Sequence, residues 1–156
     1  MSYEVLKLLH IVGVILLVGN VTVTSVWKVF AERTREPATI AFAQRLVTGT
    51  DWTLTAGGIV LTVVGGYGML LVAGLPWFGM GWLLWSQVLF GVSGLIWLVA
   101  LLPIQVRQAR MTRAFAAGGE IPPAYWRLAR AWIVWGVVAT LPLLAAMWLM
   151  VAKRPL

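Results

Sequence analysis

The chain lacks cysteine altogether, and this absence removes several kinds of chemistry at once. Without thiols there is no disulfide, no thiolate zinc site, no cysteine-held iron–sulfur cluster and no cysteine nucleophile. Histidine is nearly as scarce, because His10 is the only one in 156 residues. One imidazole cannot build a zinc or copper site by itself. We therefore predict no metal site made of protein ligands.

Charged residues are also few, at 11% of the chain, whereas a soluble domain carries roughly 25%. Hydrophobic residues make up 61%, and the mean hydropathy is +0.91. This is the composition of an integral membrane protein, and the length suits a single domain over residues 1–156. No paired acids, Ser–His–Asp order or phosphate-binding loop is present, so the sequence assigns no catalytic residue.

Four apolar stretches are each long enough to cross a hydrocarbon core of about 30 Å. They lie at about 5–30, 51–75, 82–105 and 131–151. The connection between the second and third is short and uncharged, which predicts an antiparallel hairpin. We expect an all-α protein, an integral membrane four-helix bundle with antiparallel up-down-up-down topology. Within the connection 31–50 we expect a short interfacial helix that breaks at Thr48-Gly49-Thr50, where Thr50 or Asp51 caps the next helix.

Lysine and arginine are distributed unevenly between the two ends of these spans. Nine lie in or beside the connections 31–50 and 106–130, and three lie near the opposite ends. The positive-inside rule then places both connections in the cytoplasm and both termini in the periplasm, for a multi-pass protein of the bacterial inner membrane. The net charge of +7 comes from short segments between apolar spans. We therefore expect contact with the lipid bilayer and no nucleic-acid partner.

A polar stripe runs along the first span, and a stripe of small residues runs along the second. The first has the 3–4 spacing of one helix face, and the second repeats that spacing. Unpaired polar groups are costly in hydrocarbon, so both stripes should face other helices. At the end of the first stripe, Trp27 and Lys28 are expected to be interface anchors. The stripes consist of His10, Gly13, Leu17, Asn20, Thr24 and Trp27, and of Asp51, Thr55, Gly58, Thr62, Gly65 and Met69. Gly58, Thr62 and Gly66 also make small-xxx-small steps that favour close helix contact.

Several of these side chains are candidates for a polar core, and each has two interpretations. Asn20 either forms an interhelical hydrogen bond or belongs to a mid-membrane polar site with Thr24, Thr55, Thr62, Ser86, Ser93 and Gln87. Asp51 is expected to cap a helix and to pair with Arg45 or Lys28. The predicted polar core consists of Asn20, Thr24, Asp51, Thr55, Thr62 and Gln87.

His10 lies about one turn inside the outward end of the first span. In one interpretation it is hydrogen-bonded to a neighbouring helix or a lipid headgroup. In the other it is an axial ligand of haem b. The second axial ligand would then be a Met, the His10 of another protomer, or absent.

Five segments together resemble a bacterial family of four-span membrane proteins, domain of unknown function 2269. They are LKLLHIVGVILLVGN, VWK at 26–28, DW at 51–52, LLPIQVR at 101–107 and MVAKRP near the end. The family's usual Lys-Pro ending differs here, because Arg154 stands between Lys153 and Pro155. The resemblance implies a four-span inner-membrane protein and implies no activity.

The histidine of the first span is more distantly similar to HemJ-type protoporphyrinogen oxidases and CopD-like membrane proteins. The HemJ-type resemblance implies haem b on His10. That oxidase pattern also uses a lysine in a later helix, and this chain has none between Lys28 and Lys153. We therefore carry forward two functions: a non-enzymatic membrane module accessory to a redox or respiratory complex, or a haem b-binding redox protein. Its partners would be further copies of the chain or subunits of that complex.

Overall fold

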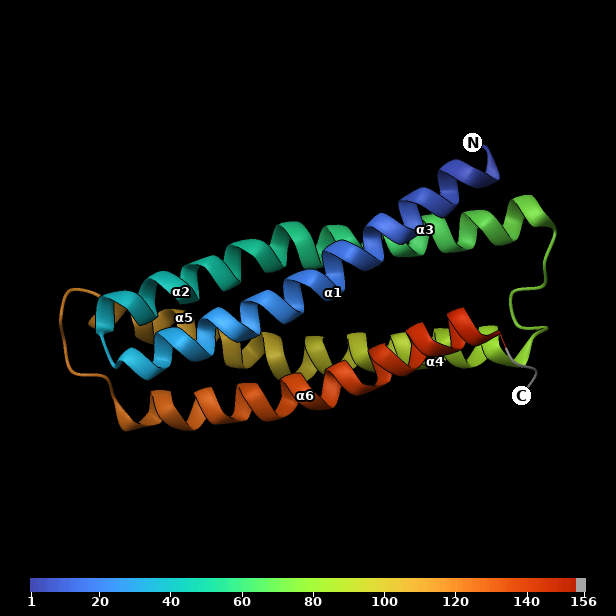
Figure 1. The fold of residues 1–156 in the computed structure, drawn as a ribbon. Helices are drawn as coiled ribbons and strands as arrows, with labels where there is room; N and C mark the ends of the chain where they lie inside the picture. The colour runs from blue at the N-terminus through green and yellow to red at the C-terminus, as the bar shows by residue number, and fades with distance from the viewer. Residues whose placement is uncertain (154–156) are drawn as a thin grey trace. The chain divides into compact units, whose positions relative to one another are not determined.

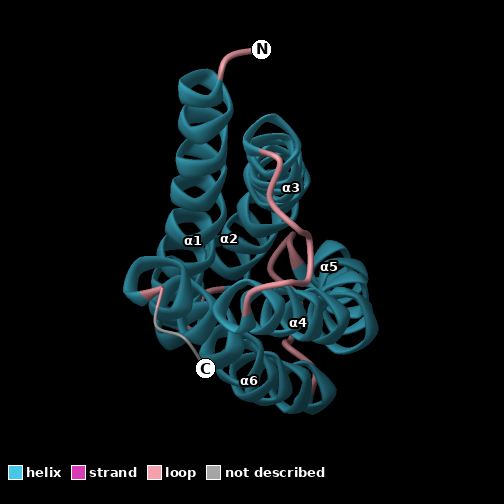
Figure 2. Cartoon of the chain, turned by 90° about the vertical axis from the view of Figure 1, so that its right-hand side faces the viewer, coloured by secondary structure: helices cyan, strands magenta, loops and turns pink. Residues whose placement is uncertain are grey.

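The computed structural model describes residues 1–153 of the chain. These residues form helices joined by short loops, and no strand occurs among them (Figure 2). The helices are α1 (Tyr3–Thr34), α2 (Pro37–Thr50), η1 (Asp51–Thr55), α3 (Ala56–Ala73), α4 (Gly81–Ile96), η2 (Trp97–Leu101), α5 (Leu102–Phe115) and α6 (Pro123–Ala152), where η marks a wider π-helical turn. The all-α prediction is confirmed.

Four continuous helices are long and apolar enough to cross a membrane: Tyr3–Thr34, Pro37–Ala73, Gly81–Phe115 and Pro123–Ala152. The four predicted spans fall on these helices, one on each. At 1.5 Å per residue, 30 to 37 residues extend about 45–55 Å, well beyond a hydrocarbon core of about 30 Å. Each helix therefore has turns to spare outside the core.

The helix break expected at Thr48-Gly49-Thr50 is absent, and that prediction is wrong. Thr50 has helical backbone angles and makes no capping bond with its side chain. Instead, the hydroxyls of Thr48 and Thr50 donate to the carbonyl oxygens of Gln44 and Leu46, one turn back in the same helix. Because these hydroxyls are satisfied inside the helix, the threonines do not favour a turn. The chain runs from α2 through η1 into α3.

The chain divides into two compact units. The first consists of residues 1–75 and 109–121, and the second consists of residues 76–108 and the residues from 122 onward. In the first unit α1 packs against α2, η1 and α3, and the chain reverses direction at Arg35 (Figure 1). Arg35 has a φ of 56°, a left-handed conformation that ends α1, and Pro37 then begins α2. The arrangement of all four spans as one antiparallel bundle, in one domain, stays a prediction.

The backbones of α1 and α3 touch at glycines. A Cβ atom on Gly13 would lie 2.5 Å from the nitrogen of Thr62, and one on Gly58 would lie 2.8 Å from the carbonyl oxygen of Gly13. A Cβ on Gly65 would lie 2.5 Å from the nitrogen of His10. The close-contact role expected for Gly58 and Thr62 is confirmed. Gly65 makes the third backbone contact, whereas Gly66 faces the His10 ring.

In the second unit α4 packs against α6 through serine and alanine. The hydroxyl of Ser93 donates to the carbonyl oxygen of Ala139 at 2.8 Å, and that of Ser86 donates to the carbonyl oxygen of Ala146 at 3.4 Å. Both alanines are buried. Small side chains bring these helices close enough for each hydroxyl to reach the backbone of the other helix.

Candidate functional site: the polar stripe of α1

The buried face of α1 carries polar side chains at three levels, His10, Asn20 and Lys28. Asn20, Thr24 and Lys28 are each at most 5% exposed, and His10 is half-buried. The expected stripe is present, but it continues through Lys28. Lys28 is 1% exposed, so the prediction that it is an interface anchor is wrong. It lies four residues after Thr24, on the same helix face.

At the first level, His10 bonds to the backbone of α3. Its Nδ1 lies 2.7 Å from the carbonyl oxygen of Thr62. A carbonyl can only accept, so Nδ1 carries the hydrogen, and in the neutral imidazole Nε2 then has the lone pair. Gly66 borders the ring, because a Cβ there would lie 3.1 Å from Nδ1. The Thr62 hydroxyl is buried and has no hydrogen-bond partner among the described residues.

The second level is a triangle of Asn20, Asp51 and Thr55. The side-chain nitrogen of Asn20 donates to Oδ1 of Asp51 and to the hydroxyl of Thr55, both at 2.9 Å. The Thr55 hydroxyl donates to the same Oδ1 at 3.0 Å. The hydroxyl of Thr24 bonds to the carbonyl oxygen of Asn20 on its own helix. The structure therefore joins three of the predicted polar-core residues through their side chains and one through the backbone.

Asp51 does not cap a helix as expected, because it lies inside the continuous helix Pro37–Ala73. It begins the π-helical turn η1, in which the N–H of Ala56 reaches the carbonyl oxygen of Asp51, five residues back. Single π-helical turns within α-helices occur frequently at functional sites. Here the turn carries Asp51 and Thr55, which both accept hydrogen bonds from the Asn20 side chain.

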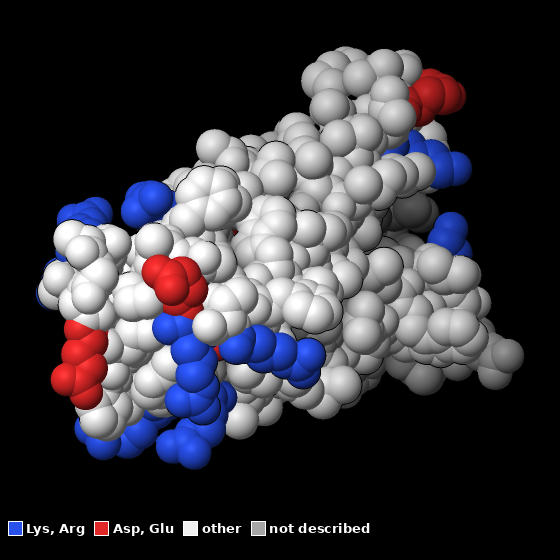
Figure 3. Space-filling model, turned by 60° about the vertical axis from the view of Figure 1, so that its left-hand side comes forward, with Lys and Arg blue, Asp and Glu red and all other residues white. Residues whose placement is uncertain are grey.

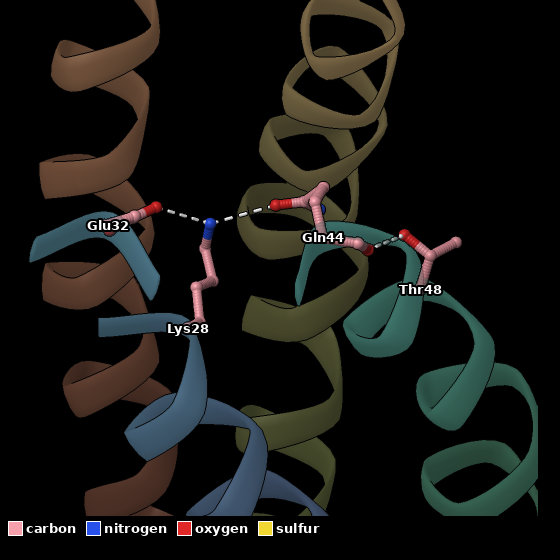
Figure 4. Close-up of polar contacts among 4 residues, drawn as sticks. All are labelled: Lys28, Glu32, Gln44 and Thr48. Carbon is pink, nitrogen blue, oxygen red and sulfur yellow. Dashed lines mark hydrogen bonds and ion pairs between the residues drawn. The ribbon is translucent and has the colours of Figure 1, made fainter. Parts of the chain in front are cut away.

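The third level is a buried ion pair joined to α2 (Figure 4). The ammonium of Lys28 donates to Oε1 of Glu32 at 2.6 Å and to Oε1 of Gln44 at 2.9 Å. The backbone carbonyl oxygen of Gln44 accepts a hydrogen bond from the Thr48 hydroxyl. The side-chain nitrogen of Gln44 is buried and has no hydrogen-bond partner among the described residues. Sequence reasoning missed Glu32 and Gln44. Glu32 could have been found from the sequence, because it follows Thr24 and Lys28 at four-residue spacing and so lies on the same face of α1.

Gln87, the remaining predicted core residue, belongs to the second unit. Its side-chain nitrogen donates to the carbonyl oxygens of Trp77 and Leu83, at 2.8 and 3.2 Å. The bond to Trp77 fastens α4 to the preceding loop, whereas the bond to Leu83 lies within α4. Its role in a polar core stays a prediction.

No group of three or more His, Cys, Asp or Glu residues lies close enough to hold a metal ion within residues 1–153. His10, Asn20 and Lys28 of α1 instead bond to the second long helix of their unit, and most exposed side chains of both helices are apolar. Apolar outer faces with inward polar bonds define a multi-pass integral membrane protein of transmembrane helices, which implies a lipid bilayer as its surroundings.

Within that class the chain belongs to the family described as predicted integral membrane protein (DUF2269), whose model matches residues 4–154. The resemblance to this four-span family is thereby confirmed. No curated protein and no solved structure matches the chain.

Proposed function

We propose that this protein is a non-enzymatic membrane module, an accessory subunit of a redox or respiratory complex. The observation that supports a structural role for the polar groups is the set of three bonds from α1 to Pro37–Ala73: His10 to Thr62, Asn20 to Asp51 and Lys28 to Gln44. Their α1 residues are ten and eight positions apart, about 15 and 12 Å along the axis. The polar groups join the two helices over about half of their length.

The outward face of α1 supports a role in assembly. Ile15 is 63% exposed and Leu8 is 60% exposed, and Val23 and Val26 are exposed as well. Such a face contacts lipid tails or the apolar helices of another subunit. A module of this kind adds transmembrane surface to a complex while its own polar groups hold its helices together.

Crosslinking at matched positions of α1 tests this proposal. A photoreactive amino acid at Ile15, which points outward, is expected to capture a subunit of a respiratory complex in intact cells. The same group at Leu17, 6% exposed, is expected to react within the chain. Native electrophoresis in mild detergent should show the protein migrating with that complex. Migration alone, with only lipid captured from Ile15, would contradict the proposal.

We also propose that the protein resides in the bacterial inner membrane with both termini periplasmic. Support comes from the nine-to-three distribution of basic residues and from the basic side chains seen at the end where α1 meets α2 (Figure 3). A reporter fused near Gly118 should report cytoplasm, and one fused after the last residue should report periplasm. A cytoplasmic signal from the C-terminal fusion would sink this topology.

A second function, binding of haem b, is favoured by the geometry of His10. Histidines that ligate metals usually donate their other ring N–H to a carbonyl or carboxylate, as Nδ1 of His10 donates to Thr62. Nε2 of the neutral imidazole is then the nitrogen that could ligate the iron, and one imidazole fills one axial position. His10 would hold the haem, and Thr62 would fix the ring. A bound haem would supply one-electron transfer.

Visible spectroscopy separates the two functions. Protein purified from haem-replete cells should show a Soret band if haem binds, and His10→Ala should abolish it while circular dichroism stays helical. The module without haem predicts a colourless protein. Haem retained unchanged in His10→Ala would remove His10 as the ligand.

A further inference from the structure

Two arginines at the α1–α2 end of the first unit lie over exposed phenylalanine rings. The guanidinium carbon of Arg33 is 5.5 Å from the centroid of Phe30, and that of Arg45 is 6.0 Å from the centroid of Phe42. Each pair has the same spacing of three residues on its helix, so ring and cation share a face. The rings are 60% and 55% exposed.

An exposed phenyl ring beneath a guanidinium suits the membrane interface better than it suits water. At the boundary between acyl chains and headgroups, the ring can enter the apolar layer while the arginine extends to the phosphate level. The planar guanidinium has a fork of N–H donors that matches two phosphate oxygens, and it can stack on the ring at the same time.

The net charge around these pairs is positive. Between residues 28 and 45 the chain carries four basic residues, Lys28, Arg33, Arg35 and Arg45, and two acidic ones, Glu32 and Glu36. The Lys28–Glu32 pair is buried and internally balanced. The exposed remainder is three arginines and one glutamate, which complements an anionic surface.

We propose that Phe30–Arg33 and Phe42–Arg45 form a binding surface for the phosphate headgroups of anionic phospholipids. The occupant is a lipid, because each cation comes with an exposed phenyl ring suited to acyl chains. Charge alone would be served equally well by lysine, whereas this surface requires the planar guanidinium and the ring beneath it.

The test uses the full chain in nanodiscs of 80% phosphatidylcholine and 20% phosphatidylglycerol, with bound lipid identified by native mass spectrometry. The native protein should retain phosphatidylglycerol above its share in the disc. Arg33→Lys with Arg45→Lys keeps the charge but loses the two-point guanidinium contact with phosphate, and should reduce that enrichment about threefold. The control is Arg35→Lys. Arg35 has no phenylalanine three residues earlier, because position 32 is a glutamate, so this change should leave the enrichment unchanged.

A second variant, Phe30→Leu with Phe42→Leu, keeps the apolar side chains, removes the aromatic faces and should give the same loss. It decides the matter if the lysine variant does not fold. The proposal is overturned by absence of enrichment in the native protein or by an equal loss in Arg35→Lys. It is also overturned if both double variants keep full enrichment, or if polyglutamate displaces the lipid and binds equally well in pure phosphatidylcholine, which would indicate an acidic protein partner.

Discussion

The imidazole of His10 donates a hydrogen bond of 2.7 Å to the carbonyl oxygen of Thr62, 52 positions away in the chain. The bond forms where the α1 and α3 backbones come closest, since a Cβ on Gly65 would meet the nitrogen of His10. A close approach made by glycine thus lets a side chain reach the main chain of the neighbouring helix. This relationship makes His10 a structural residue whether or not it also binds a ligand.

His10→Ala is expected to lower the free energy of unfolding by about 1 kcal/mol, the size of a side-chain hydrogen bond between membrane helices. Unfolding by dodecyl sulfate in mild detergent micelles, followed by circular dichroism, measures the loss. Leu8→Ala is the control, since Leu8 is 60% exposed on the same helix. Equal stability of His10→Ala and the native protein would mean that the bond contributes nothing.

Neighbouring glycines of α3 should respond in opposite ways to alanine. A methyl at Gly58 would lie 2.8 Å from backbone atoms of α1, so Gly58→Ala should cost about 1–3 kcal/mol by overpacking. A methyl at Gly57 meets nothing within 4 Å, so Gly57→Ala should be neutral or stabilise by up to about 1 kcal/mol. Thermal unfolding in detergent compares the two. The same effect from both would show that α1 and α3 do not touch at Gly58.

Removing Lys28 should be among the most damaging changes in the first unit. Lys28→Met leaves the Glu32 carboxylate buried without its ammonium, which typically costs about 3–5 kcal/mol. Lys28→Met with Glu32→Gln removes both charges and should recover much of the loss. Lys7→Met, a change of an exposed lysine on the same helix, should have little effect. A double variant no more stable than Lys28→Met would argue against a compensated pair.

Much of the stripe on α1 was predictable, because a helical period of 3.6 residues places His10, Asn20 and Thr24 on one face whatever the partner helix is. The register between helices was not, since it depends on backbone contacts at Gly13, Gly58 and Gly65 that join distant segments. The periodicity placed all three glycines on the predicted helix faces, together with Gly66, but it did not indicate which backbone atoms they would meet.

The burial of Lys28 and the continuity of the helix through Thr50 were also missed. A lysine near the end of an apolar span usually marks an interface, whereas Lys28 is buried and bonds to Glu32 and to Gln44 of α2. Thr-Gly-Thr is a helix-breaking composition on local propensity alone. Packing against α1 and hydroxyl bonds to earlier carbonyls override that propensity.

The central claim is that the polar side chains of α1 join it to the helix Pro37–Ala73, and a double-mutant cycle on Asn20 and Asp51 tests it most directly. Stability is measured for the native protein, Asn20→Ala, Asp51→Ala and the double variant, by dodecyl sulfate unfolding in the same micelles. The 2.9 Å bond between these side chains predicts a coupling of about 1 kcal/mol, so that the double variant loses less than the two single losses combined. Losses additive to within about 0.3 kcal/mol would contradict the claim.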